Sequence, residues 1–154
     1  MTSTDRTDLL TAIRSAIASS PNADGAMRQA VRLLKDAIPY YTWVGIYLLD
    51  GNELVLGPFL GKPSPHTRIP LGRGICGAAA AEKATIIVDD VNADARYLAC
   101  SIETKSEIVV PIMEDGEVLG EIDVDSDTAA AFGAADRRLL EQVAALLAES
   151  QSED

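Results

Sequence analysis

The sequence predicts an α+β fold, in which helices from both ends of the chain cover one face of a central antiparallel sheet. Apolar residues recur with helical spacing near both termini, whereas the middle of the chain alternates as strands do. Short turns, such as residues 51–52 and 115–116, join successive strands, and such tight connections link antiparallel neighbours. An amphipathic helix buries its apolar stripe against another layer, so the terminal helices should pack on the sheet.

Three amphipathic helices account for the terminal segments. Their apolar stripes are Leu9, Ile13 and Ile17; Met27, Val31, Leu34 and Ile38; and Leu139, Leu140, Val143, Leu146 and Leu147. Pro39 ends the second helix. The chain has 154 residues, 47% of them hydrophobic, which is enough for one core. Residues 1–154 are therefore expected to form a single domain, with frayed ends at 1–7 and 149–154.

The segment 41–49 is expected to be a central strand, because neither of its faces carries a charge. One face comprises Thr42, Val44, Ile46 and Leu48, and the other comprises Trp43, Gly45 and Tyr47. A glycine inside a strand often marks the close approach of a ligand or of another backbone. Gly45, between two aromatic residues, is a candidate for such a place.

A hairpin is predicted at residues 106–126. Asp115 and Gly116 tolerate the positive φ of a tight hairpin turn, and β-branched runs flank them. In the second strand, Glu121, Asp123 and Asp125 alternate with apolar residues, which places three carboxylates on one face, about 6 to 7 Å apart. This face is either solvated or opposite a positively charged or hydrogen-bond-donating group.

Charge and composition exclude several classes of partner. The formal net charge is −11 and the sequence pI is near 4.4, which argues against nucleic acid and anionic membranes because both bind basic surfaces. No apolar run approaches the roughly 18 residues of a membrane helix, and the N-terminus lacks the features of a signal peptide. We therefore expect a cytoplasmic protein whose two cysteines are held reduced.

Glycines at 72, 74 and 77 precede an alanine-rich helical run. Their spacing matches the dinucleotide-binding fingerprint, but the βαβ unit that this fingerprint requires is missing, so we assign no such site. Cys76 falls in the first turn of this helix. The helix dipole would favour a thiolate there, whereas burial between the helix and the sheet would make Cys76 an inert core residue.

Cys100 lies in a long loop that leads into the hairpin, and loops carry functional residues often. His66 is the only histidine, and two cysteines with one histidine lack the fourth ligand of a tetrahedral metal site. Neither a metal nor a bound cofactor is expected, and a single histidine in a loop argues against a catalytic triad. Two thiols and a row of carboxylates remain as the candidate chemistry.

Several motifs in combination resemble the GAF-domain free methionine-R-sulfoxide reductases. They are WVGIYLL at 43–49, LVLGPF at 54–59 with Gly61-Lys62, RIP at 68–70 with GRGICG at 72–77, Ala99-Cys100, SEIVVP at 106–111 and IDVDS at 122–126. The similarity covers about residues 27–147. The motifs are specific in combination, whereas the SEIVVP segment taken by itself also occurs in GAF domains that merely bind ligands. The resemblance implies a GAF fold, which is PAS-like, with ligand-pocket loops on the sheet face opposite the terminal helices.

The resemblance also implies a reaction. A cysteine at the position of Cys100 would attack the sulfur of free L-methionine-R-sulfoxide, methionine would leave, and a second cysteine would resolve the sulfenic acid. Thioredoxin, reduced with electrons from NADPH, would then recycle the enzyme. The residues that match the substrate site are Glu107, Asp123, Asp125, Trp43 and Tyr47. Glu121 matches no residue of that site and is expected to be solvated at its rim, and a homodimer is a further expectation.

One difference from the family concerns the resolving thiol. The family commonly has a third cysteine ten residues before the position of Cys76, where this chain has His66. Either Cys76 or an external thiol could then resolve the sulfenic acid on Cys100. The alternative function is a GAF module that binds a small ligand without turning it over.

Overall fold

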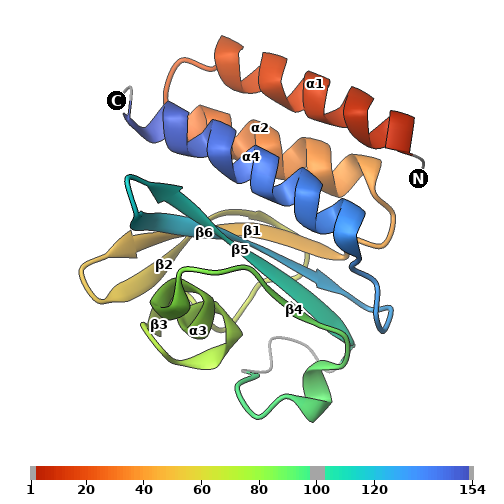
Figure 1. Ribbon diagram of the computed structural model, residues 1–154, viewed down its shortest axis with the longest axis vertical. Coiled ribbons are helices and arrows are strands. Elements are labelled where there is room, and N and C mark those ends of the chain that lie inside the picture. Colours follow the sequence, from red (N-terminus) through yellow and green to blue (C-terminus); the bar gives the residue numbers. More distant parts are fainter. Residues whose placement is uncertain (1–2, 98–102, 153–154) are drawn as a thin grey trace.

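The computed structural model describes residues 3–97 and 103–152 and has the expected α+β architecture (Figure 1). In chain order the elements are α1 (Ser3–Ser19), α2 (Ala23–Ala37), β1 (Trp43–Asp50), β2 (Glu53–Leu60), β3 (Arg68–Pro70), α3 (Gly74–Glu82), β4 (Ile86–Val88), the 3-10 turn Val91–Ala93, β5 (Ser106–Glu114), β6 (Glu117–Ser126) and α4 (Ala134–Ser152). The helix at each end and the strands between them follow the order that the sequence predicts.

The sheet has the strand order β3-β2-β1-β6-β5-β4, and its neighbouring strands are antiparallel. Helices α2 and α4 pack on one face of this sheet, and α1 lies across them as an outer layer (Figure 1). Helix α3 packs on the opposite face against β5 and β6. The stripe of α1 therefore contributes to the same core from further out than α2 and α4.

The terminal helices extend further than the apolar pattern indicates. Residues 3–7 and 149–152, which we expected to be frayed, lie within α1 and α4. At the start of α1, Arg6 donates hydrogen bonds to the hydroxyl of Tyr40 and to Asp136 Oδ1. Near the end of α4, Gln151 Nε2 lies 3.4 Å from Met27 Sδ. Polar contacts between distant segments stabilise these terminal turns, and the spacing of apolar residues cannot predict such contacts.

Both predicted hairpins are present. In the β5–β6 turn, φ is 52° at Asp115 and 79° at Gly116, which are the positive values that the Asp-Gly pair predicts. In the β1–β2 turn, Gly51 has a φ of 63°. The turn of two residues sets the register next to it, where Glu114 is paired with Glu117. A register shift between Ile112 and Met113 then offsets the pairing by one residue for the rest of the hairpin.

The sheet separates two apolar clusters. Val44 and Ile46 of β1 belong to the larger cluster, which lies under α1, α2 and α4. Trp43 and Tyr47 belong to the smaller cluster on the opposite face, which also contains Cys76. The alternation predicted for β1 is confirmed. The face of β6 that carries Glu121, Asp123 and Asp125 is therefore the face toward the smaller cluster.

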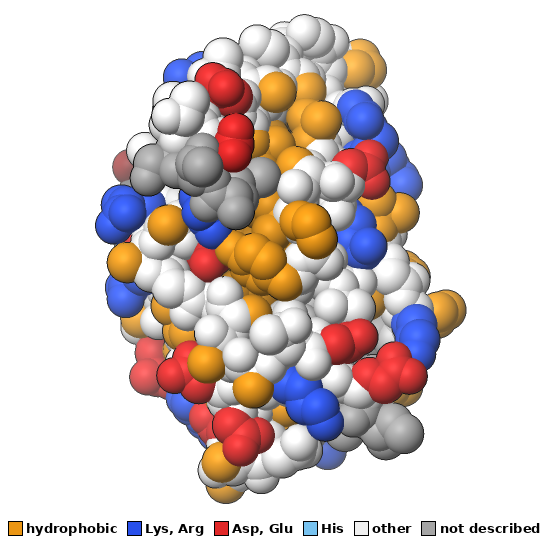
Figure 2. All heavy atoms as spheres, turned by 90° about the vertical axis from the view of Figure 1, so that its right-hand side faces the viewer, with side chains coloured by type: hydrophobic (Ala, Val, Ile, Leu, Met, Phe, Trp, Pro, Cys, Tyr) orange, Lys and Arg blue, Asp and Glu red, His pale blue; other side chains and the backbone are white. Residues whose placement is uncertain are grey.

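One side of the molecule agrees with the charge argument. Figure 2 shows the side of the molecule at the N-terminal end of α1, where hydrophobic side chains form a central strip with acidic and basic side chains scattered around it. That side mixes both signs of charge rather than presenting a continuous basic surface. None of the described helices combines the length and the hydropathy of a membrane-spanning segment.

Candidate active site

The strand register gathers the candidate residues on the sheet face that α3 covers. Asp125 of β6 is paired with Trp43 of β1 on one side and with Glu107 of β5 on the other. The next such row along β6 places Asp123 between Gly45 and Val109. Side chains at paired positions point to the same face, so Glu107, Asp123 and Asp125 form one continuous group.

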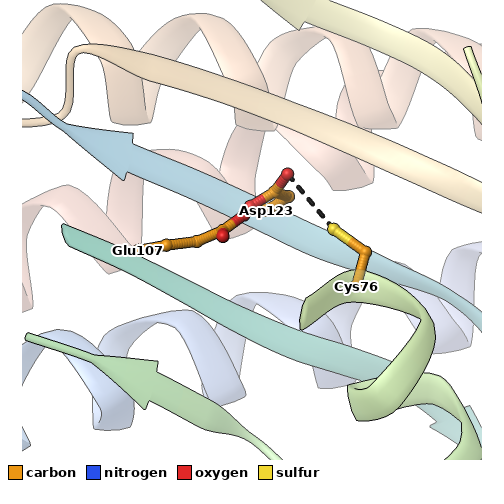
Figure 3. Close-up of side chains that lie close together, drawn as sticks. All are labelled: Cys76, Glu107 and Asp123. Atoms are coloured by element: carbon orange, nitrogen blue, oxygen red, sulfur yellow. Dashed lines mark hydrogen bonds between the residues drawn. The ribbon is translucent and has the colours of Figure 1, made fainter. Parts of the chain in front are cut away.

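Cys76 of α3 contacts this group from the helix that packs on the same face of the sheet. Its thiol donates a hydrogen bond of 3.3 Å to Oδ2 of Asp123. The sulfur of Cys76 and one carboxyl oxygen each of Glu107 and Asp123 all lie within 4.8 Å of one another. Figure 3 shows these three side chains close together. All three side chains are buried. Three elements that are distant in sequence thus contribute one polar cluster inside an apolar core.

The structure corrects the expectation that Glu121 is solvated. We expected it to be solvated at the rim, but it is 0% exposed and is paired with Tyr47 of β1 and Pro111 of β5. Neither of its carboxyl oxygens has a hydrogen-bond partner among the described residues. Helix α3 covers this part of the sheet, and an alternating pattern on a strand is the same whether its polar face is covered or solvated.

The four carboxyl groups resist ionisation. Burial, followed by the charges of Asp123 and Asp125, raises the pKa of Glu107 well above its ordinary value. Burial also raises the pKa values of Glu121, Asp123 and Asp125. The cause is general, because a charge removed from water near like charges is costly. At neutral pH such a group can hold protons and can donate them as a carboxylic acid.

Cys76 is a buried thiol rather than a thiolate. Burial raises its pKa well above the ordinary value, and the carboxyls of Asp123, Glu121 and Glu107 raise it further. These effects outweigh the N-terminal end of α3, which by itself favours the thiolate. The sequence left open whether Cys76 is a thiolate or a buried core residue. The structure supports the buried core residue, which also contacts the polar cluster.

Trp43 and Tyr47 are held by contacts to the loop between β2 and β3. Trp43 Nε1 donates a hydrogen bond of 2.9 Å to the carbonyl of Lys62, and its ring stacks on Phe59 at a centroid distance of 5.7 Å. The hydroxyl of Tyr47 donates a hydrogen bond of 2.8 Å to the carbonyl of His66. A Cβ at position 45 would lie 2.2 Å from the Trp43 ring, which explains the glycine there.

Two cavities lie beside this cluster. The larger, of about 100 Å³, is lined by Thr42, Trp43, Lys62, Glu103, Thr104, Asp125 and Asp127. The smaller, of about 20 Å³, is lined by Tyr47, His66, Ile69, Gly74, Ile75, Cys76, Glu107 and Asp123. Because Asp125 and Glu107 are cross-strand partners, the cavities are neighbours, and the candidate residues are divided between them.

Sequence reasoning missed the ion pair at the larger cavity. Lys62 Nζ lies 2.5 Å from Glu103 Oε2, and both residues line the cavity. Gly61-Lys62 was part of the recognised motif, which is the one signal that pointed to Lys62. For Glu103 there was no signal, because the sequence pattern of a long loop does not fix where its residues lie.

Cys100 lies outside the described residues, which resume at Glu103. Its expected approach to Cys76 therefore stays a prediction. Thr104, four residues after Cys100, is 4% exposed and lines the larger cavity with Glu103. Glu103 and Thr104 are thus part of the candidate site.

Comparison with known proteins places this geometry in context. Residues 22–150 match the GAF domain family. GAF domain-containing protein A of Dictyostelium discoideum is 40% identical over 141 residues, which are 91% of this chain and 88% of that protein. The free methionine-R-sulfoxide reductase of Escherichia coli K12 is 38% identical over 115 residues, or 75% of this chain and 69% of that enzyme.

Solved structures agree in fold and in sequence. The free methionine-R-sulfoxide reductase of Neisseria meningitidis, whose crystal structure contains its substrate, superposes with a TM-score of 0.91. The two sequences are 38% identical, and the match covers 96% of this chain and 88% of that one.

Proposed function

Because the chain belongs to the GAF-domain family of free methionine-R-sulfoxide reductases, we propose that it reduces free L-methionine-R-sulfoxide to methionine. The observation that carries the proposal is the buried group of Glu107, Asp123 and Asp125 beside Cys76 and two small cavities. Such a group supplies protons and binds a cationic ligand, and this reaction needs both.

The first step transfers the sulfoxide oxygen to Cys100. The thiolate of Cys100 attacks the sulfoxide sulfur while a protonated carboxyl, from Glu107, Asp123 or Asp125, delivers a proton to the oxygen. The sulfur–oxygen bond of the substrate breaks, its sulfur takes up two electrons and leaves as methionine, and Cys100 is left as the sulfenic acid. The raised pKa values of the buried carboxyls support this role, since an ordinary carboxylate has no proton to give at neutral pH.

Recognition of a free amino acid requires groups for both of its charges. Asp125 and Asp127 line the larger cavity and can accept the substrate's ammonium group. Lys62 lines the same cavity and can exchange its partner Glu103 for the substrate's carboxylate. The ring of Trp43 provides an apolar surface for the methyl thioether, a favourable contact for sulfur. A residue inside a peptide lacks both charges, which would favour the free amino acid.

Resolution of the sulfenic acid falls to Cys76 in this proposal. Its thiol displaces water from the sulfenic acid of Cys100, a disulfide forms, and thioredoxin reduces that disulfide with electrons from NADPH. Asp123, which accepts the hydrogen bond of the Cys76 thiol, is placed to take the thiol's proton. A cytoplasmic location, where disulfides are reduced, follows from this reductant.

A coupled assay tests the proposal. NADPH consumption in the presence of thioredoxin, thioredoxin reductase and free L-methionine-R-sulfoxide should depend on the protein and should be lost in Cys100→Ser. In Cys76→Ser, the thioredoxin-dependent rate should fall, while dithiothreitol, which can reduce the sulfenic acid directly, should still support turnover. Absence of turnover with every thiol reductant would exclude the reductase function.

The second candidate is a GAF module that binds a small ligand without turning it over. His66 favours it, because this residue stands where the family commonly has its third cysteine. In the structure His66 lines the smaller cavity with Cys76, so it occupies a place where a resolving thiol would be useful. Calorimetry that shows binding of methionine sulfoxide, together with no turnover in the coupled assay, would establish this alternative.

A further inference from the structure

We propose that Cys76, Glu107 and Asp123 form a binding site for a thiophilic divalent cation such as Zn²⁺ or Cd²⁺. Spacing along the sequence did not indicate a metal site, but the fold joins a thiol with carboxyls that are distant in the chain. That the cation would compete with the sulfoxide rests on the proposed function, because both would use the same residues. Cation binding itself does not depend on that function.

The donor atoms are close to the geometry that a metal requires. A zinc ion with bonds of about 2.3 Å to sulfur and about 2.0–2.2 Å to oxygen holds its ligand atoms roughly 3.3–3.7 Å apart in a tetrahedron. The Cys76 sulfur and Asp123 Oδ2 are already 3.3 Å apart, and the oxygen of Glu107 is within 4.8 Å of both. Water would take the fourth position.

The cluster lacks positive partners. Oδ1 of Asp123 and both carboxyl oxygens of Glu121 have no hydrogen-bond partner within the described ranges, and Glu121 is fully buried. None of the ion pairs found in residues 3–97 and 103–152 involves Glu107, Glu121, Asp123 or Asp125. Glu121 acts electrostatically on Cys76 and so faces the same cluster. Buried polar groups without partners are costly, and a bound cation would satisfy them.

The cluster also has room for an ion. The cavity of about 20 Å³ beside Cys76, Glu107 and Asp123 is large enough for one water-sized occupant. One sulfur and two carboxylate ligands select Zn²⁺ or Cd²⁺ over Mg²⁺ and Ca²⁺, which prefer oxygen alone. Binding replaces the thiol proton: the S–H bond of Cys76 breaks, a sulfur–metal bond forms, and the proton leaves to solvent with no change of oxidation state.

Titration with Cd²⁺ tests the site in the Cys100→Ser protein, in which Cys76 is the only thiol. We expect one equivalent of Cd²⁺ to produce the ultraviolet thiolate-to-cadmium charge-transfer band. The band should be absent when Cys76→Ser is added, and Asp123→Asn should weaken the affinity by more than about tenfold. Glu117→Gln is the matched control, because Glu117 is exposed on the same strand and should leave the affinity unchanged.

A second measurement needs no change in the cluster and so avoids the risk of a misfolded variant. In Cys100→Ser, saturating Cd²⁺ should slow the alkylation of Cys76 by at least about tenfold, because a coordinated thiolate is not free to react. No charge-transfer band and no protection would overturn the proposal, and so would a band that persists without Cys76. If the coupled assay shows turnover, Zn²⁺ should raise the apparent KM for the sulfoxide; if it shows none, the titration still decides the cation site.

Discussion

The thiol of Cys76 donates a hydrogen bond of 3.3 Å to Asp123 across 47 positions of sequence, and this bond joins α3 to β6 at the centre of the proposed active site. It gives the buried thiol a polar partner, yet the same carboxyl group opposes ionisation of the thiol by its charge. Cys76 is therefore held in place and kept protonated by one neighbour. The reactivity of this cysteine should depend on Asp123 more than on the helix that carries it.

Replacing Asp123 by asparagine should make Cys76 more reactive. Among the causes that raise the pKa of Cys76, the charge of Asp123 is second only to burial. Its removal lowers that pKa, and one pKa unit corresponds to about tenfold in thiolate fraction. In the Cys100→Ser background, alkylation by iodoacetamide at a fixed pH near 8 should accelerate roughly tenfold in Asp123→Asn and should not change in Glu117→Gln. An unchanged or slower rate in Asp123→Asn would contradict this account of the Cys76 pKa.

Glu121 should make the protein less stable as the pH rises. Burial raises its folded-state pKa above the ordinary value of 4.5, so the folded protein keeps a proton that the unfolded chain has lost. The stabilisation is complete below pH 4.5 and is lost as the pH rises through the folded-state pKa. A full proton corresponds to about 1.4 kcal/mol per pH unit, and Glu121→Gln should remove up to that slope.

Urea denaturation at several values from about pH 5 to about pH 8 measures this slope. The wild-type protein should lose free energy of unfolding over the range, and Glu121→Gln should lose less. Glu117→Gln should follow the wild type, because Glu117 is exposed on the same strand. Identical slopes for Glu121→Gln and the wild type would mean that Glu121 ionises in the folded protein as it does in the unfolded chain, which contradicts a raised pKa.

Gly45→Ala should displace Trp43. A Cβ at position 45 would lie 2.2 Å and 2.6 Å from two carbon atoms of the indole, so the ring must move. Overpacking of this kind costs about 1 to 3 kcal/mol of unfolding free energy. Trp43 is the only tryptophan, so its fluorescence reports the change directly. Gly133→Ala, whose Cβ would have no neighbour within 4 Å, should leave the Trp43 emission unchanged.

Lys62→Met should weaken substrate binding more than it slows the chemical step. Lys62 lines the larger cavity together with Asp125, and in the proposed function it binds the substrate carboxylate, which is remote from the reacting sulfur. An interaction of this kind is equal in the ground state and the transition state, so KM should rise roughly fivefold or more while kcat changes little. Lys105→Met, which alters an exposed lysine outside the cavity, serves as the control. An equal loss of kcat and kcat/KM would place Lys62 in the chemical step instead.

Local chemistry explains which parts of the fold the sequence predicts well. The β5–β6 hairpin follows from Asp115-Gly116, because the positive φ values and the register belong to the turn itself. The uncharged faces of β1 likewise indicate a central strand, and Trp43 and Tyr47 do lie on the side opposite the larger core. The shared face of Glu121, Asp123 and Asp125 follows from the alternation along β6. The pairing of Glu107 with Asp125 does not follow from the turn, because it depends on a register shift between Ile112 and Met113.

Features that depend on contacts between distant segments were not predictable in this way. Glu121 lies in the same alternating pattern as Asp123, and that pattern does not show that this face of the strand is buried in the folded protein. Burial, followed by the carboxyls from β5 and β6, raises the pKa of Cys76, and its position in the first turn of a helix did not indicate these neighbours. The start of α1 at Ser3 is stabilised by the ion pair of Arg6 with Asp136, which are 130 positions apart.

The stereochemistry of methionine production tests the central claim most directly. The protein should be incubated with dithiothreitol and an equal mixture of free L-methionine-R-sulfoxide and L-methionine-S-sulfoxide, and both epimers and methionine should be measured by chromatography. Our account predicts that the R epimer is consumed to completion, that methionine appears in equal amount, that the S epimer remains, and that Cys100→Ser leaves both epimers intact. Persistence of both epimers with the wild-type protein, or equal consumption of the two, would contradict it.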